Sequence, residues 1–249
     1  MKRSKLSGII PVVFFILIWE FLGRAGIFQR EIFPPFTAVL NEFFVLLKGG
    51  VLLENFLASF KRVVIGFFLG AITGIFAGII MGCNRVLDRT FSPLISFLYP
   101  VPALGWLPVL MLWIGVNDML PITIIFICSF FPVCYSTVSG IKNVDRNIID
   151  VARTLGATKF KVLKNILLPL ALPYIFTGLR LEAGMAWRVI IAAEMVAIPV
   201  GLGSLMMRAE SLIRMDIIIV CLFVLSVMTF IFERILLLIE RKFTIWKSE

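Results

Sequence analysis

The chain has 249 residues, of which 60% are hydrophobic and only 16% are charged, and its mean hydropathy is +1.04. Soluble domains are about half apolar and a quarter charged, so this composition excludes such a domain and indicates an integral membrane protein. The formal charge is +9. Because the sequence has no histidine and no cluster of cysteine or acidic ligands, a metalloenzyme or a histidine-based catalytic triad is excluded.

Six apolar stretches predict membrane spans, since a helix needs roughly 20 apolar residues to cross a bilayer. Backbone groups in lipid must form their hydrogen bonds within the segment, so we expect helices and an all-α fold. Residues 1–249 are expected to form a single transmembrane domain, because the sequence shows no internal repeat and no charged linker. The predicted spans are residues 8–23, 63–83, 94–116, 121–140, 173–199 and 217–239.

The first span follows the basic start MKRSK, which suits either a retained anchor or a removed signal peptide. It lacks a clear A-x-A cleavage site, so we expect a retained anchor.

The segment after the first span contains a second helical pattern. Pro34 and Pro35 mark a helix start, and Phe43, Leu46 and Leu47 share one helical face. We expect an interfacial helix here. A short extra span is the alternative, and the charged residues of the segment disfavour it.

The second span carries glycines at strict four-residue intervals: Gly66, Gly70, Gly74, Gly78 and Gly82. Each step advances about 40° around a helix, so the glycines form one winding groove. Small residues at this spacing let another helix approach closely in lipid. The partner helix belongs either to the same subunit or to a second copy.

The third span contains Pro93, Pro100, Pro102 and Pro108, with Trp106 among them. Prolines remove backbone donors and bend helices, so this span is not expected to be straight. Non-helical backbone at membrane depth is tolerated where protein or a water-filled path surrounds it. The span is therefore a candidate wall of a pathway, with a purely structural kink as the alternative.

The four cysteines, Cys83, Cys128, Cys134 and Cys221, lie within or at the edge of spans and show no C-x-x-C spacing. We expect them to be buried apolar residues, as free cysteines commonly are, and not part of a metal site or a disulfide.

The distribution of positive charge predicts the orientation. With the N-terminus in the cytoplasm, the inward segments carry 14 lysines and arginines and the outward segments carry 7. The positive-inside rule then places both termini of a multi-pass protein of the cell membrane in the cytoplasm. The basic surplus needs no nucleic acid to explain it.

Residues 141–169 form the longest inward segment, and Gly156 divides it. Apolar residues fall on one helical face before the glycine and again after it, where the lysines lie mostly opposite. Two short helices with a turn at Gly156 are predicted, and Pro169 and Pro173 are expected to end the second one. Helices this short need a surface to pack on, which is either their own subunit or the groove of a soluble partner.

This segment resembles the E-A-A-x3-G-x9-I-x-L-P signature of inner-membrane permease subunits of ATP-binding cassette (ABC) importers. The spacing is complete through Gly156, Ile166 and Pro169; Asp150 and Val151 replace the usual Glu and Ala. The stretches YPVPALGWLPVLMLWIGVND and LPYIFTGLRLEAGMAWRVIIAAEMV are similar to the nitrate/sulfonate/taurine branch of this binding-protein-dependent transport family.

The resemblance implies a six-transmembrane-helix type I permease fold, called MetI-like. It also implies a homodimer of permeases in membrane lipid, a cytoplasmic ABC ATPase subunit, and a periplasmic or lipid-anchored solute-binding protein. The chain has no G-x4-G-K-[ST] phosphate loop, so it is not expected to be an enzyme, and ATP would be used by the partner subunit with no cofactor bound here. The residues implied in ATPase coupling are Asp150, Ala152, Thr154, Leu155, Gly156, Ala157, Lys159, Ile166 and Pro169. The implied solute is a small anion such as nitrate, a sulfonate or taurine.

Charged residues in the fifth span, Arg180, Glu182, Arg188 and Glu194, are costly in lipid and must pair or line a polar cavity. Their spacing gives no favourable pair within the helix, so partners must come from other helices or a second subunit. Arg188 could instead contact an anionic solute. The residues considered for a translocation path are Pro100, Pro102, Trp106, Arg180, Trp187, Arg188 and Glu194. Trp187 could equally serve packing.

Arg208, Glu210 and Asp216 are placed in an outward loop, which either meets the binding protein or is simply solvated.

Two other functions compete with the importer. An ion-coupled secondary transporter would typically show repeated halves and unwound helices, and only the proline-rich span hints at one. A membrane scaffold would leave the segment around Gly156 without a role.

Overall fold

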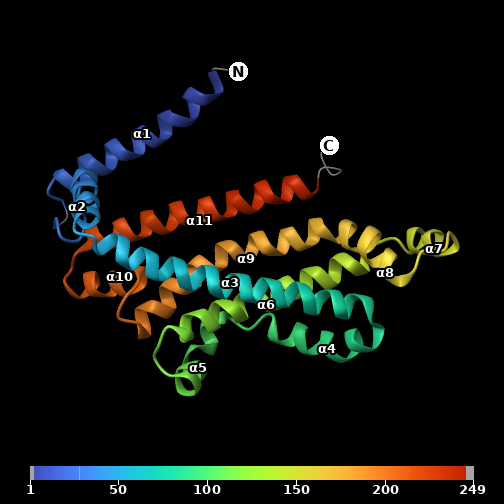
Figure 1. The fold of residues 1–249 in the computed structure, drawn as a ribbon. Helices are drawn as coiled ribbons and strands as arrows, with labels where there is room; N and C mark the ends of the chain where they lie inside the picture. The colour runs from blue at the N-terminus through green and yellow to red at the C-terminus, as the bar shows by residue number, and fades with distance from the viewer. Residues whose placement is uncertain (1–2, 28, 245–249) are drawn as a thin grey trace. The chain divides into compact units, whose positions relative to one another are not determined.

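The computed structural model describes residues 3–27 and 29–244, apart from the side chains of residues 3–9 and 197. This part of the chain consists of helices and turns without a strand (Figure 1). In chain order the elements are α1 (Arg3–Arg24), α2 (Phe36–Lys48), α3 (Val51–Cys83), α4 (Arg85–Leu98), the 3₁₀ turn η1 (Ala103–Trp106), α5 (Leu107–Ile114), α6 (Met119–Lys142), α7 (Arg146–Thr154), α8 (Lys159–Val162), the π turn η2 (Leu163–Leu167), α9 (Leu168–Ala197), α10 (Leu202–Ser211) and α11 (Met215–Phe243).

The chain divides into two compact units. Unit 1 comprises Met1–Ser59 and Glu194–Ser226, and unit 2 comprises Phe60–Ala193 and Val227–Glu249. Helices α3, α9 and α11 each contribute residues to both units.

Four helices of the described chain are long and apolar enough to cross a membrane: Val51–Cys83, Met119–Lys142, Lys159–Val196 and Met215–Phe243. They contain the second, fourth, fifth and sixth predicted spans, the fifth apart from its last three residues. A bent pair of helices at the third span raises the number to five. The first predicted span, 8–23, lies in α1 and includes residues whose side chains are outside the described part, so it stays a prediction.

The third span is broken, as its prolines predict. Helices α4 and Ala103–Ile114 are bent by 91° relative to each other. The break falls at residues 99–102, where Pro100 and Pro102 lack the N–H groups that would continue the helix. Helix α4 itself begins at a cap, because the Asn84 side chain accepts hydrogen bonds from the backbone of Val86 and Leu87.

The glycine groove of α3 is filled by α6 of the same chain, within unit 2. A Cβ atom at Gly66 would lie 2.8 Å from the Ile122 carbonyl oxygen, and one at Gly70 would lie 2.6 Å from that of Phe126. Such distances are shorter than any real Cβ contact, so only glycine permits this helix separation. Packing inside one subunit, one of the two alternatives for this motif, is confirmed.

In unit 1, α2 begins directly after Pro35, which confirms the predicted helix start. The Trp19 indole of α1 donates to the Pro34 carbonyl oxygen at 3.0 Å, and Glu20 accepts hydrogen bonds from the backbone and hydroxyl of Thr37. These contacts fix the turn between α1 and α2.

The prediction of four buried cysteines is wrong for Cys83, which is exposed because it lies in the last turn of α3. Cys134 and Cys221 are buried, and Cys128 is half-buried. All four thiols are free.

Candidate functional site

Helix α7, the turn at Gly156 and α8 form a helical hairpin, as the sequence predicts. Asp145 caps α7, and Thr158 caps α8. Gly156 has φ +83°, a left-handed conformation that glycine adopts at little cost. The Ala157 N–H donates to the Ala152 carbonyl oxygen at 2.9 Å, which closes the end of α7.

Several apolar side chains of this hairpin are exposed, whereas Val162 of α8 is buried. Leu155 is 82% exposed, Phe160 70% and Val151 59%. These three side chains are therefore not buried on their own chain, which was one of the two alternatives left open by the sequence for the apolar face. Of the other residues implied in coupling, Asp150, Thr154 and Lys159 are exposed, and Ala152, Ala157, Ile166 and Pro169 are half-buried.

Helix α8 continues into α9 without a break. The two helices and the π turn between them form one apolar helix, Lys159–Val196, of 38 residues. The expectation that Pro169 and Pro173 end the second short helix is wrong. The π turn interrupts the α-helical hydrogen-bond pattern and ends two residues before Pro169, which cannot donate, so the helix can continue.

A cavity of about 1060 Å³ lies in unit 2 beside this long helix. Four of the residues considered for a path line it: Pro100, Pro102, Arg180 and Arg188. The broken third span thus forms one wall, and α9 forms another. Tyr99, Glu182, Glu233 and Arg234 also line the cavity; of these, the sequence reasoning singled out only Glu182, and only as a costly charge.

Three of the five charged residues of the cavity are engaged by neighbouring side chains. Arg180 pairs with Glu240 of α11 at 3.2 Å, and the Cys128 thiol of α6 donates to Glu182 at 3.4 Å. The prediction that partners come from other helices is confirmed for both. The Arg234 guanidinium lies 4.9 Å from the ring centre of Phe230, within range of a cation–π contact.

Trp187 and Trp106 do not line the cavity. Trp187 is completely buried and packs against the rings of Phe60 and Phe232. Its role is packing, the alternative left open for it. Trp106 is half-buried in η1.

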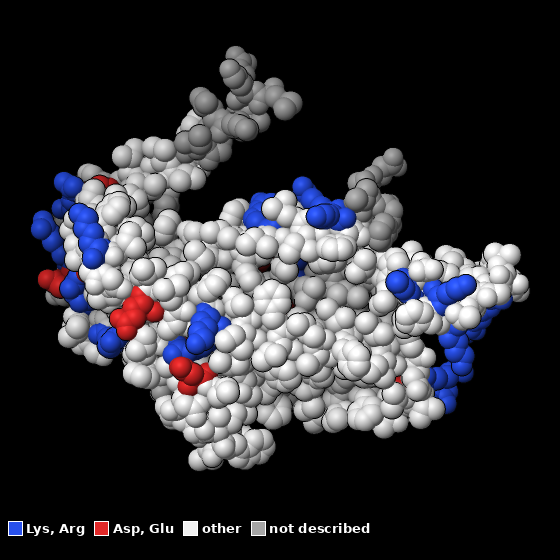
Figure 2. All heavy atoms as spheres, viewed as in Figure 1, with Lys and Arg blue, Asp and Glu red and all other residues white. Residues whose placement is uncertain are grey.

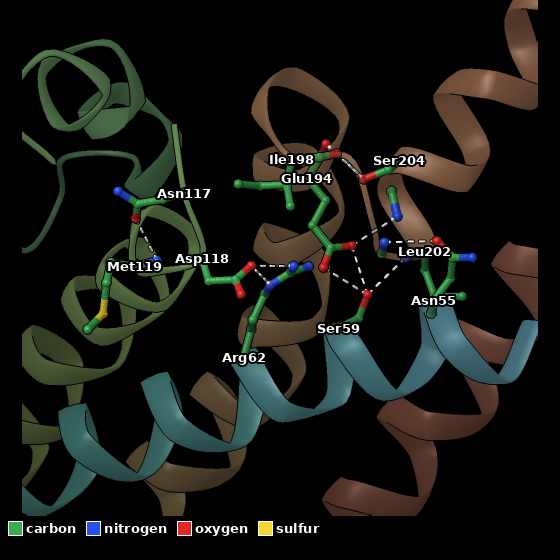
Figure 3. A network of polar contacts seen from close by, with 12 residues as sticks. Asn55, Ser59, Arg62, Asn117, Asp118, Met119, Glu194, Ile198, Leu202 and Ser204 are labelled. Carbon is green, nitrogen blue, oxygen red and sulfur yellow. Dashed lines mark hydrogen bonds and ion pairs between the residues drawn. The ribbon is translucent and has the colours of Figure 1, made fainter. Parts of the chain in front are cut away.

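Glu194 does not line this cavity either, and its part in a path stays a prediction. It is 1% exposed within unit 1. The Ser59 hydroxyl lies 2.8 Å from each of its carboxylate oxygens, and the Gly203 N–H donates to it at 3.0 Å (Figure 3). The Leu202 N–H in turn donates to the Ser59 oxygen at 2.9 Å. The carboxylate therefore holds the start of α10 against α3.

Other residues of unit 1 extend this network. The Asn55 side chain accepts from the Gly201 N–H at 2.9 Å and from the guanidinium of Arg208 at 3.2 Å. The Ser204 hydroxyl donates to the Ile198 carbonyl oxygen. Sequence reasoning missed Ser59 and Asn55, because single polar residues in an amphipathic stretch carry no signal of a partner more than 100 residues away.

An ion pair of unit 2 involves Arg62 and Asp118. Arg62 of α3, which is buried, lies 2.5 Å from an oxygen of Asp118, the residue directly before α6 (Figure 3).

The predicted outward loop contains a helix with a buried face. Leu202, Leu205 and Ala209 of α10 are buried, whereas Arg208 and Glu210 are exposed. Asp216 pairs with Arg214 at 2.8 Å.

These features define a class of protein: an all-α membrane protein with a broken span beside a charged cavity and an exposed helical hairpin. The model of the family described as the inner membrane component of binding-protein-dependent transport systems matches residues 70–245. The chain belongs to this family, and it is the permease subunit of an ABC importer, with the ATPase on a separate subunit. This membership favours the importer over an ion-coupled carrier.

Several relatives match most of the chain. A putative ABC transporter permease of Methanocaldococcus jannaschii is 39% identical over 94% of this chain and 89% of its own length. The taurine transport permease TauC of Escherichia coli is 29% identical over 100% and 92%. The bicarbonate transport permease CmpB of a Synechocystis species is 36% identical over 78% and 74%.

Solved structures show the same fold. An amino acid ABC transporter crystallised with histidines matches with a TM-score of 0.66 and 20% identity, over 80% of this chain and 98% of that one. An inward-facing MetNI methionine ABC transporter matches with a TM-score of 0.58 and 16% identity, over 72% and 91%. The MetI-like permease fold expected from the sequence is confirmed.

Proposed function

We propose that two copies of this chain form the path of an importer for a small anion such as nitrate, a sulfonate or taurine. The names of the relatives support this substrate class, since they include permeases for taurine, aliphatic sulfonates and bicarbonate. The composition of the cavity also supports it, because three arginines and two glutamates line its wall.

One observation carries the coupling part of the proposal: the exposed hairpin is continuous with the helix that lines the cavity. The apolar side chains of Leu155 and Phe160 stand at one end of a 38-residue helix system, and Arg180 and Arg188 lie along its length. A helix without a break transmits displacement as a rigid element. Movement of a subunit bound at the hairpin would therefore move the cavity wall.

The partner at the hairpin is the cytoplasmic ABC ATPase. An amphipathic helix placed in a groove is a common mode of recognition, and the bare apolar face fits it. The ATPase binds and hydrolyses ATP, so this chain needs no bound cofactor. ATP-driven closure of the ATPase pair would bias two states of the permease, with access from the inside in one and from the outside in the other.

The hairpin, and with it both termini, lies on the cytoplasmic side. Lysines and arginines gather where α7 and α8 are found (Figure 2), among them the exposed Lys159, Lys161 and Lys164. The positive-inside rule supports this orientation. The opposite face then receives the solute from a periplasmic or lipid-anchored binding protein.

The test is co-purification of the ATPase with the tagged permease from its native membrane. We expect the double variant Leu155→Ser, Phe160→Ser to lose the ATPase, because the two exposed side chains provide the apolar contact. Both are exposed, so the fold should be retained, as size-exclusion chromatography would verify. Val86→Ser removes an equally exposed apolar side chain outside the hairpin and serves as the matched control. ATPase recovery that is equal in all variants would contradict the docking role, and recovery with none of them would contradict the importer.

A further inference from the structure

Two charged side chains of the cavity, Arg188 and Glu233, form no ion pair with any of the described residues. Arg188 of α9 lines the cavity, and its Nη1 atom contacts only the thioether sulfur of Met185, at 3.8 Å, a weak acceptor. Glu233 of α11 also lines the cavity and forms no hydrogen bond or ion pair within the described chain. Both are exposed.

The other charges of the cavity each have a neighbouring side chain that engages them, although only Arg180 has an ion pair. Arg180 is paired with Glu240, Glu182 accepts the hydrogen bond of Cys128, and Arg234 lies over Phe230. Arg188 and Glu233 are the positive and the negative group that are engaged least. Charges at membrane depth are costly unless they are paired or solvated, so these two groups depend on water or on a bound polar solute in the cavity.

The positions of Arg188 and of the Glu233 carboxylate can both be located along α9. A carboxylate oxygen of Glu233 lies 2.6 Å from the position that a Cβ atom would take at Gly184, so the absence of a side chain there lets Glu233 rest against α9. Gly184 and Arg188 are four residues apart and therefore share one helical face, about 6 Å apart along the axis. The carboxylate thus lies one helical turn from the anchor of the arginine.

We propose that Arg188 and Glu233 form a two-point site for a small zwitterion, whose acidic group binds Arg188 and whose ammonium group binds Glu233. A guanidinium donates two parallel hydrogen bonds to a sulfonate or carboxylate, and a carboxylate accepts from an ammonium group. The inference rests on the proposed import function and narrows its substrate class to amino sulfonates or amino acids, as opposed to inorganic anions.

The test measures binding to the purified permease–ATPase complex without the binding protein, so that the selectivity of that protein does not enter. The probes are radiolabelled taurine and ethanesulfonate, which has the sulfonate but no amine. We expect Arg188→Gln to weaken the binding of both probes by about 10-fold or more, since each loses a charge-assisted contact. Glu233→Gln should weaken taurine by a similar factor and leave ethanesulfonate nearly unchanged.

Two further variants serve as controls. Arg188→Lys keeps the charge and should restore part of the binding of both probes, which a merely structural role would not predict. Arg241→Gln removes a positive charge from an exposed arginine outside the cavity and should bind taurine like the wild type. ATPase retention by every variant shows that the complex is intact.

Several results would overturn the site. If Glu233→Gln weakened the binding of taurine and of ethanesulfonate equally, the proposed contact between Glu233 and the ammonium group would be refuted. A wild-type complex that imports nitrate or bicarbonate but does not bind taurine would leave the proposed function standing and refute this inference alone. Phosphatidylethanolamine carries the same pair of charges; if it co-purifies with the wild type and not with the variants, and no taurine binds, the site belongs to a lipid headgroup.

Discussion

Gly70→Val tests the packing of α3 on α6. The Cβ atom alone would lie 2.6 Å from the Phe126 carbonyl oxygen, where ordinary contacts begin at 3.4 Å. The helices would have to separate by about 0.8 Å, enough to lose a large part of the dispersion energy of their interface. Overpacking of this kind costs roughly 1–3 kcal/mol, and valine adds two methyl groups beyond the Cβ atom, so we expect the upper half of that range.

The assay is thermal unfolding of the purified permease in detergent. For a chain of this size, 1 kcal/mol corresponds to about 2–4 °C, so the apparent Tm should fall by roughly 4–12 °C. Gly105→Val is the matched control, because a Cβ atom there meets nothing within 4 Å. Since α6 of the same chain fills the groove, the loss should not depend on protein concentration. An unchanged Tm, or a loss that disappears on dilution to monomers, would refute the reasoning.

Three further predictions concern unit 1, the hairpin and the orientation. Ser59→Ala removes the hydroxyl that bridges Glu194 and the Leu202 N–H, and leaves both buried groups short of a partner; the Tm should fall by an amount equivalent to about 1–3 kcal/mol, and Ser59→Thr should recover part of it. Gly156→Ala places a side chain at φ +83°, costing about 1–2 kcal/mol, so proteolysis of the hairpin should accelerate, and less so in Gly156→Asn, whose side chain tolerates this conformation. A membrane-impermeant maleimide should label Cys83, the exposed thiol, in inside-out vesicles and not in right-side-out ones; the reverse pattern would contradict the orientation.

The sequence alone determines features that depend on local composition and spacing. Apolar length predicts the spans, because a bilayer demands about 20 apolar residues whatever surrounds them. The prolines between residues 93 and 108 predict the broken third span, because a missing N–H group acts locally. Gly156 predicts the turn of the hairpin for the same reason, and the four-residue glycine spacing predicts a close helix contact, though not its partner.

The residues considered for a translocation path fall into two groups, those that line the cavity and those that do not. Pro100, Pro102, Arg180 and Arg188 line the cavity, and their part in a path stays a prediction. Glu194 looks the same in sequence, as a charge within an apolar stretch. Its environment is decided by Ser59, which is 135 residues away along the chain.

Only the tertiary structure decides which charges find partners. Pairing depends on distances between helices that are far apart in sequence. The structure shows that Glu240 pairs with Arg180, whereas Arg188 and Glu233 remain unpaired among the described residues. The structure likewise shows that α8 continues into α9 through the π turn before Pro169, although the prolines predict the end of a helix. Composition and spacing therefore determined that this is a membrane protein with a helical hairpin, and the resemblance of that segment to the importer signature indicated a permease. The long-range contacts, which no local pattern encodes, decided which charged side chains of the cavity find partners.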